Sequence, residues 1–185
     1  LDLSYDSKSG PYVGGSVTAI LTGKDRAGLL GARTYAGYAT RTATGIGLDA
    51  GIAAYLFTSR YSGNREDQYV EVYAGMSRGP LSAYLRFSPD YLGRHTPVIY
   101  ADIGAARQLA PKWRLSGHLG VLVQTSGAPD LGGRRARYDT RLGISRTLGS
   151  FEAQAAWTFA GPGRQYFQGP WHGHSAVTLS LRRSF

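Results

Sequence analysis

The sequence contains no cysteine, which excludes disulfide bonds and thiolate metal sites. It also lacks any apolar run of about eighteen residues, the length that a membrane-spanning helix requires. Lysine occurs only at Lys8, Lys24 and Lys112, so arginine supplies most of the 21 basic residues. Because the first residue is Leu1 and not methionine, we expect a mature chain or part of one.

The net charge of +9 first suggests a nucleic-acid partner. Phosphate binding, however, requires basic residues gathered on one face. Here they are scattered, and no basic run exceeds the pairs Arg134-Arg135 and Arg182-Arg183. We therefore expect no nucleic-acid partner.

Apolar and polar residues alternate with a period of two along most of the chain. In the clearest stretch, from Ile46 to Leu56, every even position is apolar, and Asp49 and Tyr55 lie between them. This period is typical of β-strands, because successive side chains point to opposite faces. The pattern recurs often enough to predict eleven strands in one all-β domain over residues 1–185, with the first strand, Leu1 to Asp6, only partial.

The second face of these strands has an unusual composition. A soluble sandwich would present lysine and glutamate to water, whereas this face carries tyrosine, six arginines (33, 41, 86, 114, 141, 182) and five acidic residues. We expect the opposite charges to form arginine–carboxylate pairs inside a barrel. The predicted lumen-lining residues are Arg33, Tyr35, Asp49, Tyr55, Glu71, Tyr73, Tyr84, Arg86, Tyr100, Asp102, Arg114, His118, Arg141, Glu152 and Arg182.

The predicted connections alternate between short and long. Short ones are Ser7–Pro11, Thr42–Gly45, Ser77–Pro80, Leu109–Lys112 and Leu148–Ser150; long ones are Thr22–Gly28, Thr58–Asp67, Ser88–Thr96, Thr125–Ala136 and Gly161–His174. Outer-membrane barrels have short periplasmic turns and long extracellular loops. The pattern predicts an antiparallel up-and-down transmembrane β-barrel in a bacterial outer membrane, with a periplasmic C-terminus. Since closure needs an even number of strands, we expect about twelve, the first lying upstream of Leu1.

Aromatic residues stand near both ends of the apolar rows, where membrane interfaces favour rings with polar edges. They are Phe87, Tyr138, Trp157 and Phe159 at one end, and Tyr38, Trp113, Phe151 and Phe185 at the other. Phe185 is in phase with the last apolar row and is interpreted as an assembly signal. The expected partners are therefore membrane lipids, lipopolysaccharide and the outer-membrane assembly machinery.

Three short motifs follow one another between Tyr69 and Gly93: Tyr73-Ala74-Gly75, Gly79-Pro80-Leu81-Ser82 and Ser88-Pro89-Asp90-Tyr91. In this order they resemble the Gcw_chp family of conserved bacterial outer-membrane proteins, and the segment from Trp113 to Gly120 is similar to the family's next strand. The resemblance implies a barrel with one further strand upstream. It leaves the activity open, and the loops containing Arg134 and Trp171 match no family pattern.

The sequence leaves several functions open. We expect no catalytic residue, cofactor or metal, because the pair His172 and His174 lacks a nearby acidic ligand. The first hypothesis is a small pore for small, possibly anionic solutes. The alternative is a non-conducting barrel that binds another envelope protein, with loop contacts at Tyr91, Tyr166, Phe167, Trp171 and His172. A rim hydrolase using His95 with Asp90, or His172 and His174 with Asp130, is a third hypothesis.

Overall fold

The computed structural model describes residues 1–20, 28–58, 67–128, 134–161 and 174–183. The chain divides into two compact units. The first comprises Leu1–Met76 with Leu85–Ile99, and the second comprises Ser77–Tyr84 with Tyr100–Phe185. No helix in the described ranges is long and apolar enough to cross a membrane.

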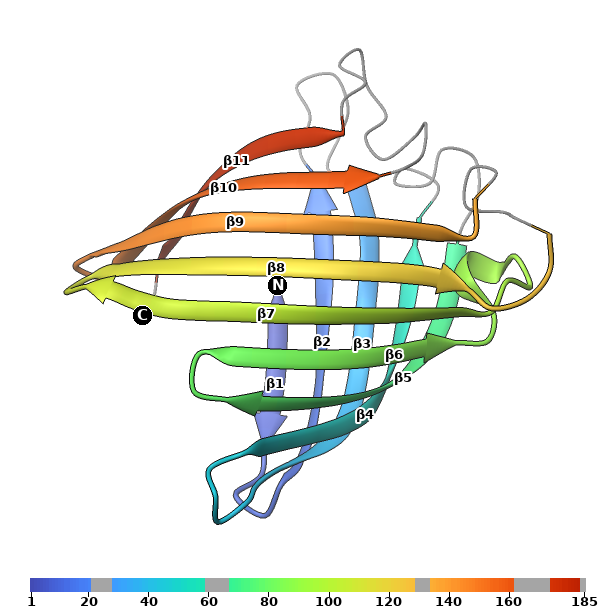
Figure 1. Cartoon of the computed structure of the whole chain (residues 1–185), viewed down its shortest axis with the longest axis horizontal. Helices are drawn as coiled ribbons and strands as arrows, with labels where there is room; N and C mark the ends of the chain where they lie inside the picture. The colour runs from blue at the N-terminus through green and yellow to red at the C-terminus, as the bar shows by residue number, and fades with distance from the viewer. Residues whose placement is uncertain (21–27, 59–66, 129–133, 162–173, 184–185) are drawn as a thin grey trace. The chain divides into compact units, whose positions relative to one another are not determined.

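Eleven strands form a single sheet in which each strand lies beside its neighbour in the sequence (Figure 1). They are β1 (Asp2–Asp6), β2 (Pro11–Ile20), β3 (Gly28–Arg41), β4 (Gly47–Phe57), β5 (Asp67–Arg78), β6 (Leu81–Ser88), β7 (Val98–Ala110), β8 (Trp113–Gln124), β9 (Ala136–Leu148), β10 (Phe151–Gly161) and β11 (Ser175–Arg183). A 3-10 turn, η1 (Tyr91–Gly93), lies between β6 and β7. The prediction of eleven antiparallel strands in meander order is confirmed.

The closed barrel that the sequence predicts is not present among the described residues. There, β1 and β11 stand at the two ends of the strand order and do not pair with each other. Their apolar side chains are correspondingly more open, since Leu3 is 69% exposed and Leu179 is 81% exposed. The physical reason is that closure requires a hydrogen-bonded partner for both edge strands.

The alternation of short and long connections is confirmed. Only Gly79 and Pro80 separate β5 from β6, and only Gly149 and Ser150 separate β9 from β10. The connections that follow β2, β4, β6, β8 and β10 are each longer. In the tight turns, Gly79 and Gly149 adopt positive φ angles of 56° and 64°, a conformation that glycine accepts without a steric penalty.

The two faces of the strands have the reverse of the burial found in a soluble protein. On β4, the side chains of Leu48, Ile52 and Leu56 are 40%, 48% and 38% exposed, whereas Asp49 and Tyr55 on the other face are half-buried. The same alternation appears on β5, where Val70, Val72 and Met76 are exposed and Glu71 is buried. The predicted division into an apolar and a polar face is thus confirmed, with the apolar face turned outward.

The β7–β8 turn, Pro111-Lys112, offers a test of the turn geometry. Lys112 has a φ of 71°, which is unfavourable for any residue with a Cβ. Lys112→Gly should therefore raise the free energy of unfolding by about 1 kcal/mol, and Gly149→Ala should lower it by a similar amount. Urea titration in detergent micelles measures both, with Ser150→Ala as the neutral control. Equal stabilities for all three variants would contradict the turn geometry.

Candidate functional site

The polar face of the strands holds most of the predicted lumen-lining residues. Twelve of the fifteen are buried or half-buried there, whereas Arg114, Arg141 and Arg182 are exposed. All three exposed residues lie in β8, β9 and β11, and Arg182 stands directly opposite Glu152 in the strand register. The structure therefore groups these residues by face, and the role of that face as the wall of a lumen stays a prediction.

Tyrosine rings on this face lie over glycines of the neighbouring strand. Tyr12 is paired with Gly37 in the register of β2 and β3, and its hydroxyl occupies the space that a Cβ at Gly37 would need. The Tyr73 hydroxyl covers Gly51 in the same manner. A glycine leaves a gap in a pleated surface that a large neighbouring ring can fill. This packing pairs large and absent side chains on neighbouring strands.

In the first unit, Tyr12 also binds a carboxylate, and the Tyr73 hydroxyl lies beside it. The Tyr12 hydroxyl donates to Asp49 Oδ1 at 2.5 Å and lies 2.6 Å from the Tyr73 hydroxyl. The three side chains come from β2, β4 and β5. Asp49 therefore accepts a hydrogen bond from a phenol group, which helps to satisfy a half-buried charge.

A second group in the same unit surrounds Glu71, which is buried in β5. The Tyr55 hydroxyl donates to Glu71 Oε1 at 2.8 Å, and Arg86 Nε lies 3.8 Å from the same oxygen. Tyr55 is also stacked on Tyr69, with ring centroids 4.6 Å apart, and Tyr69 contacts Tyr91 at 4.9 Å. These contacts fix the Tyr55 ring in one orientation.

Arg33 lies at the other side of Tyr55 and borders a pocket of about 140 Å³. Its guanidinium carbon is 4.8 Å from the Tyr35 ring and 5.4 Å from the Tyr55 ring. Its Nε is buried and has no hydrogen-bond partner among the described residues. The pocket is lined by Ser16, Thr18, Leu30, Gly31, Ala32, Arg33, Tyr55 and Phe57.

Gly31 lines this pocket and has no side chain that could fill it. Gly31 is paired with Thr18 on one side and Phe57 on the other in the strand register. It lies two residues from Arg33, which is paired with Ser16 and Tyr55. A Cβ at Gly31 would clash with the Leu56 carbonyl. The pocket therefore combines aromatic walls and hydroxyl groups with the side chain of Arg33, a cation that attracts small anions.

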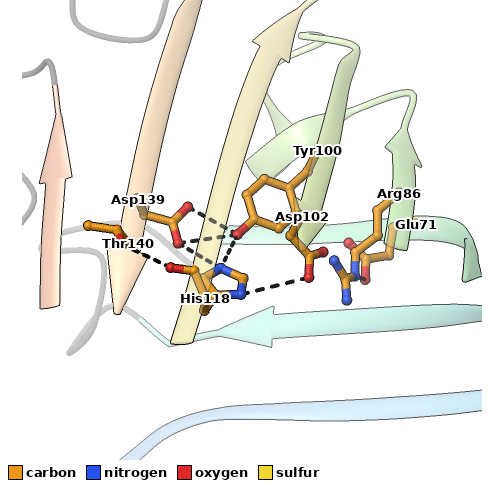
Figure 2. Close-up of polar contacts among 7 residues, drawn as sticks. All are labelled: Glu71, Arg86, Tyr100, Asp102, His118, Asp139 and Thr140. Carbon is orange, nitrogen blue, oxygen red and sulfur yellow. Dashed lines mark hydrogen bonds and ion pairs between the residues drawn. The ribbon is translucent and has the colours of Figure 1, made fainter. Parts of the chain in front are cut away.

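In the second unit, a histidine lies between two aspartates (Figure 2). His118 Nε2 is 3.0 Å from Asp139 Oδ1 and 2.9 Å from the Tyr100 hydroxyl, while His118 Nδ1 is 3.8 Å from Asp102 Oδ1. The Tyr100 hydroxyl also donates to Asp139 Oδ2 at 3.0 Å. The group joins β7, β8 and β9 and satisfies three polar side chains at once.

The contacts of three arginines on this face bear on the expected arginine–carboxylate pairs. Arg86 approaches Glu71, as predicted, but Arg33 contacts tyrosine rings and Arg141 donates to Gln154 Oε1 at 2.7 Å. Tyrosine, histidine and amide groups also bind charged side chains on this face, as Tyr12 binds Asp49 and His118 binds Asp139. The remaining arginine–carboxylate pairs stay a prediction, because the strand register and not the number of charges decides which side chains meet.

The Asp90–His95 pair that a rim hydrolase would use is a loop contact. Asp90 Oδ1 accepts a hydrogen bond from the His95 backbone at 2.5 Å, and the His95 side chain is 94% exposed. Among the residues that the structure describes, no three His, Asp or Glu side chains are spaced to hold a metal ion. Asp130, Tyr166, Phe167, Trp171, His172 and Phe185 lie outside the described residues.

The predicted set omitted two residues that the structure places on the polar face. Tyr12 binds Asp49, and Phe57 lines the pocket beside Arg33. Tyr12 was detectable from its phase, because it alternates with Val13 and Val17. Phe57 was not, because an apolar residue on a polar face breaks the pattern by which faces are assigned.

The packing of Tyr100 over Gly120 can be tested with a matched control on the same strand. Gly120→Ala would force the Tyr100 ring away from His118 and should cost about 1–3 kcal/mol of stability. Gly117→Ala should have a small effect, because no atom lies within 4 Å of an added Cβ. Urea unfolding measures both. In a Tyr100→Ala background the Gly120→Ala cost should fall to what the contact with Asp139 Oδ2 leaves, and an unchanged cost would contradict the contact with Tyr100.

Comparison with known proteins gives one result. No curated protein and no solved structure matches this chain. A family model matches residues 1–185, which is the whole sequence. The chain belongs to the family described as "Bacterial protein of unknown function (Gcw_chp)".

Proposed function

We propose that this protein is a β-barrel of the bacterial outer membrane that gives small solutes, with a preference for anions, a narrow path along its polar face. The proposal assigns no catalytic step to the chain. The observation that carries it is the burial pattern, in which apolar rows are exposed and charged rows are half-buried or buried.

The large number of exposed apolar side chains favours a lipid environment over water. Among the described residues, thirty-two large apolar side chains are exposed, whereas only Ala53, Val98, Ala156 and Ala160 form a buried apolar core. Exposed apolar surface costs about 25 cal/mol per Å² in water, and no core of this size offsets it. In a bilayer the same rows contact lipid tails, and the polar face needs only to be kept away from them.

Strand length and connections support the same environment. Strands β2, β3, β4, β5, β7, β8, β9 and β10 have 10 to 14 residues each. About 9–11 tilted residues cross a bilayer. The proposal includes closure into a barrel of about twelve strands, because an unpaired edge in lipid costs several kcal/mol per polar group. It places the short connections and the C-terminus in the periplasm, with lipid and lipopolysaccharide around the barrel.

The preference for anions rests on Arg33. Its guanidinium borders the pocket and retains an unsatisfied Nε, and its described contacts are aromatic faces. An arginine held in this way attracts anions without being neutralised by a carboxylate.

A non-conducting barrel is the second candidate, and a specific observation favours it. Polar side chains bond one another across the strands, as Tyr100, His118 and Asp139 do, and such contacts fill space that a pore would leave to water. Such a barrel would act by binding another envelope protein.

The lipid-facing role of the apolar rows predicts a dependence on depth. Ile52→Arg, near the middle of β4, should destabilise the protein folded in phospholipid vesicles by about 2–4 kcal/mol, because it places a charge at the bilayer midplane. Leu48→Arg, on the same face near the end of β4, should cost at most about 1 kcal/mol. Urea titration in vesicles gives both values. Similar small costs for the two variants would contradict a membrane location.

The solute path predicts an effect of Arg33 on ion selectivity. In planar bilayers under a salt gradient, the wild-type reversal potential should indicate anion preference, and Arg33→Gln should reduce the anion-to-cation permeability ratio roughly fivefold, about 1 kcal/mol. Arg107→Gln removes the same charge from the exposed face of β7 and serves as the control. Equal changes in both variants would refute the role of Arg33. An absence of channel openings would refute the pore and favour the second candidate.

A further inference from the structure

Four arginines of the second unit lie on its apolar face, each close to a short-turn end of a strand. Arg78 ends β5, Arg107 is near the end of β7, Arg146 is near the end of β9, and Arg183 ends β11. All four are exposed. We refer to these four residues as the arginine belt. In Figure 1 the hairpins between β7 and β8 and between β9 and β10 lie together at the left.

Each arginine of the belt follows an apolar row. The residues two and four positions earlier on the same face are Met76 and Ala74, Ala105 and Ile103, Ile144 and Leu142, and Leu181 and Leu179. Side chains two positions apart in a strand share a face, so the four rows have the same order of an apolar stretch followed by a charge. At the opposite ends of these strands, the apolar face carries residues such as Tyr138 and Val177 and no arginine among the described strand residues.

Aromatic side chains of the intervening strands hold two of these arginines in place. Trp113 is paired with Arg146 in the register of β8 and β9, and the Arg146 guanidinium lies 5.1 Å from its ring centroid. Phe151 is paired with Arg183, whose guanidinium lies 5.6 Å from that ring. Arginine over an exposed aromatic ring is a combination that suits the boundary between apolar and aqueous phases.

No carboxylate on the same face balances the belt within the described strands of this unit. The acidic residues of those strands are Asp102, Asp139 and Glu152, and all three lie on the polar face. Lys112, Arg114 and Arg182 add further positive charge at the same ends of the strands. Arg78, Arg107 and Arg146 therefore offer guanidinium groups next to apolar rows, with no carboxylate on their own face among the described strand residues of this unit.

We propose that the arginine belt binds the phosphate groups of phospholipids in the membrane leaflet at the short-turn ends of the strands, with a preference for anionic headgroups. A ligand that fits must carry an anion to the guanidinium groups and an apolar chain along the adjoining rows. A phospholipid has both parts in that order, and guanidinium binds phosphate oxygens through two parallel hydrogen bonds. This inference rests on the proposed membrane location of the protein.

The test compares folding of the full chain into vesicles of phosphatidylcholine with folding into vesicles that also contain phosphatidylglycerol. The measured quantity is the ratio of the two folding equilibrium constants from urea titrations. We expect phosphatidylglycerol to raise the wild-type constant, and the ratio to fall about fivefold for each arginine of the belt that is replaced by glutamine. The variant carries Arg78→Gln, Arg107→Gln, Arg146→Gln and Arg183→Gln.

The control has the same loss of charge near the long-loop ends of strands, through Arg94→Gln, Arg134→Gln, Arg135→Gln and Arg137→Gln. Its ratio should equal that of the wild type. Equal reductions in both fourfold variants would show attraction by net charge alone and would overturn the belt. No reduction in the belt variant, or no wild-type preference for phosphatidylglycerol, would overturn it as well.

Two further arms make the result decisive. Inorganic phosphate, added to phosphatidylcholine vesicles at matched ionic strength, should leave the folding constant unchanged; an increase lost in the belt variant would assign the belt to free phosphate and overturn the lipid proposal. If the fourfold variant does not fold, Arg107→Gln with Arg146→Gln is measured instead, with about a 25-fold reduction expected. A chain that enters neither vesicle refutes the membrane location itself, whereas entry without lipid preference refutes only the belt.

Discussion

The alternation of side chains across a pleated strand is the constraint on which this structure depends. Every strand must present two faces, and here one face is apolar while the other carries charges and tyrosines. A single sheet of this kind has no second layer among the described residues to cover its apolar rows, so those rows stay exposed. In a soluble sandwich, a second sheet would cover such rows.

The polar face meets the opposite requirement, because its charges must keep partners when water is scarce. Tyrosine satisfies this requirement better than arginine in this chain. A phenol hydroxyl reaches Asp49, Glu71 and Asp139, and in two of these cases the same ring covers a glycine of the adjacent strand. One side chain thus fills a gap in the sheet and stabilises a carboxylate. Arg33 is the exception, since its ring contacts leave a nitrogen of the guanidinium without a partner.

The two ends of the strands differ in composition as well as in connection length. Four of the five short turns contain glycine at positive φ, and the strand ends beside the short turns carry arginine on the apolar face of the second unit. The long-loop ends carry aromatic and aliphatic residues at the corresponding positions. A sheet whose two ends meet the same solvent does not require different residues at those ends. Such a difference is expected where the two ends meet different chemical surroundings, as the two leaflets of an outer membrane do.

The sequence by itself determined the number of strands in this chain, their order and the face on which most residues lie, because a period of two is a local property that needs no knowledge of distant contacts. It also determined the sorting of short and long connections. Only the tertiary structure decided which polar groups meet: Tyr12 with Asp49, Tyr100 with Asp139, and Arg33 with two rings in place of a carboxylate. Those pairings depend on the register between strands and on where glycines leave room, and neither can be read from alternation within a single strand.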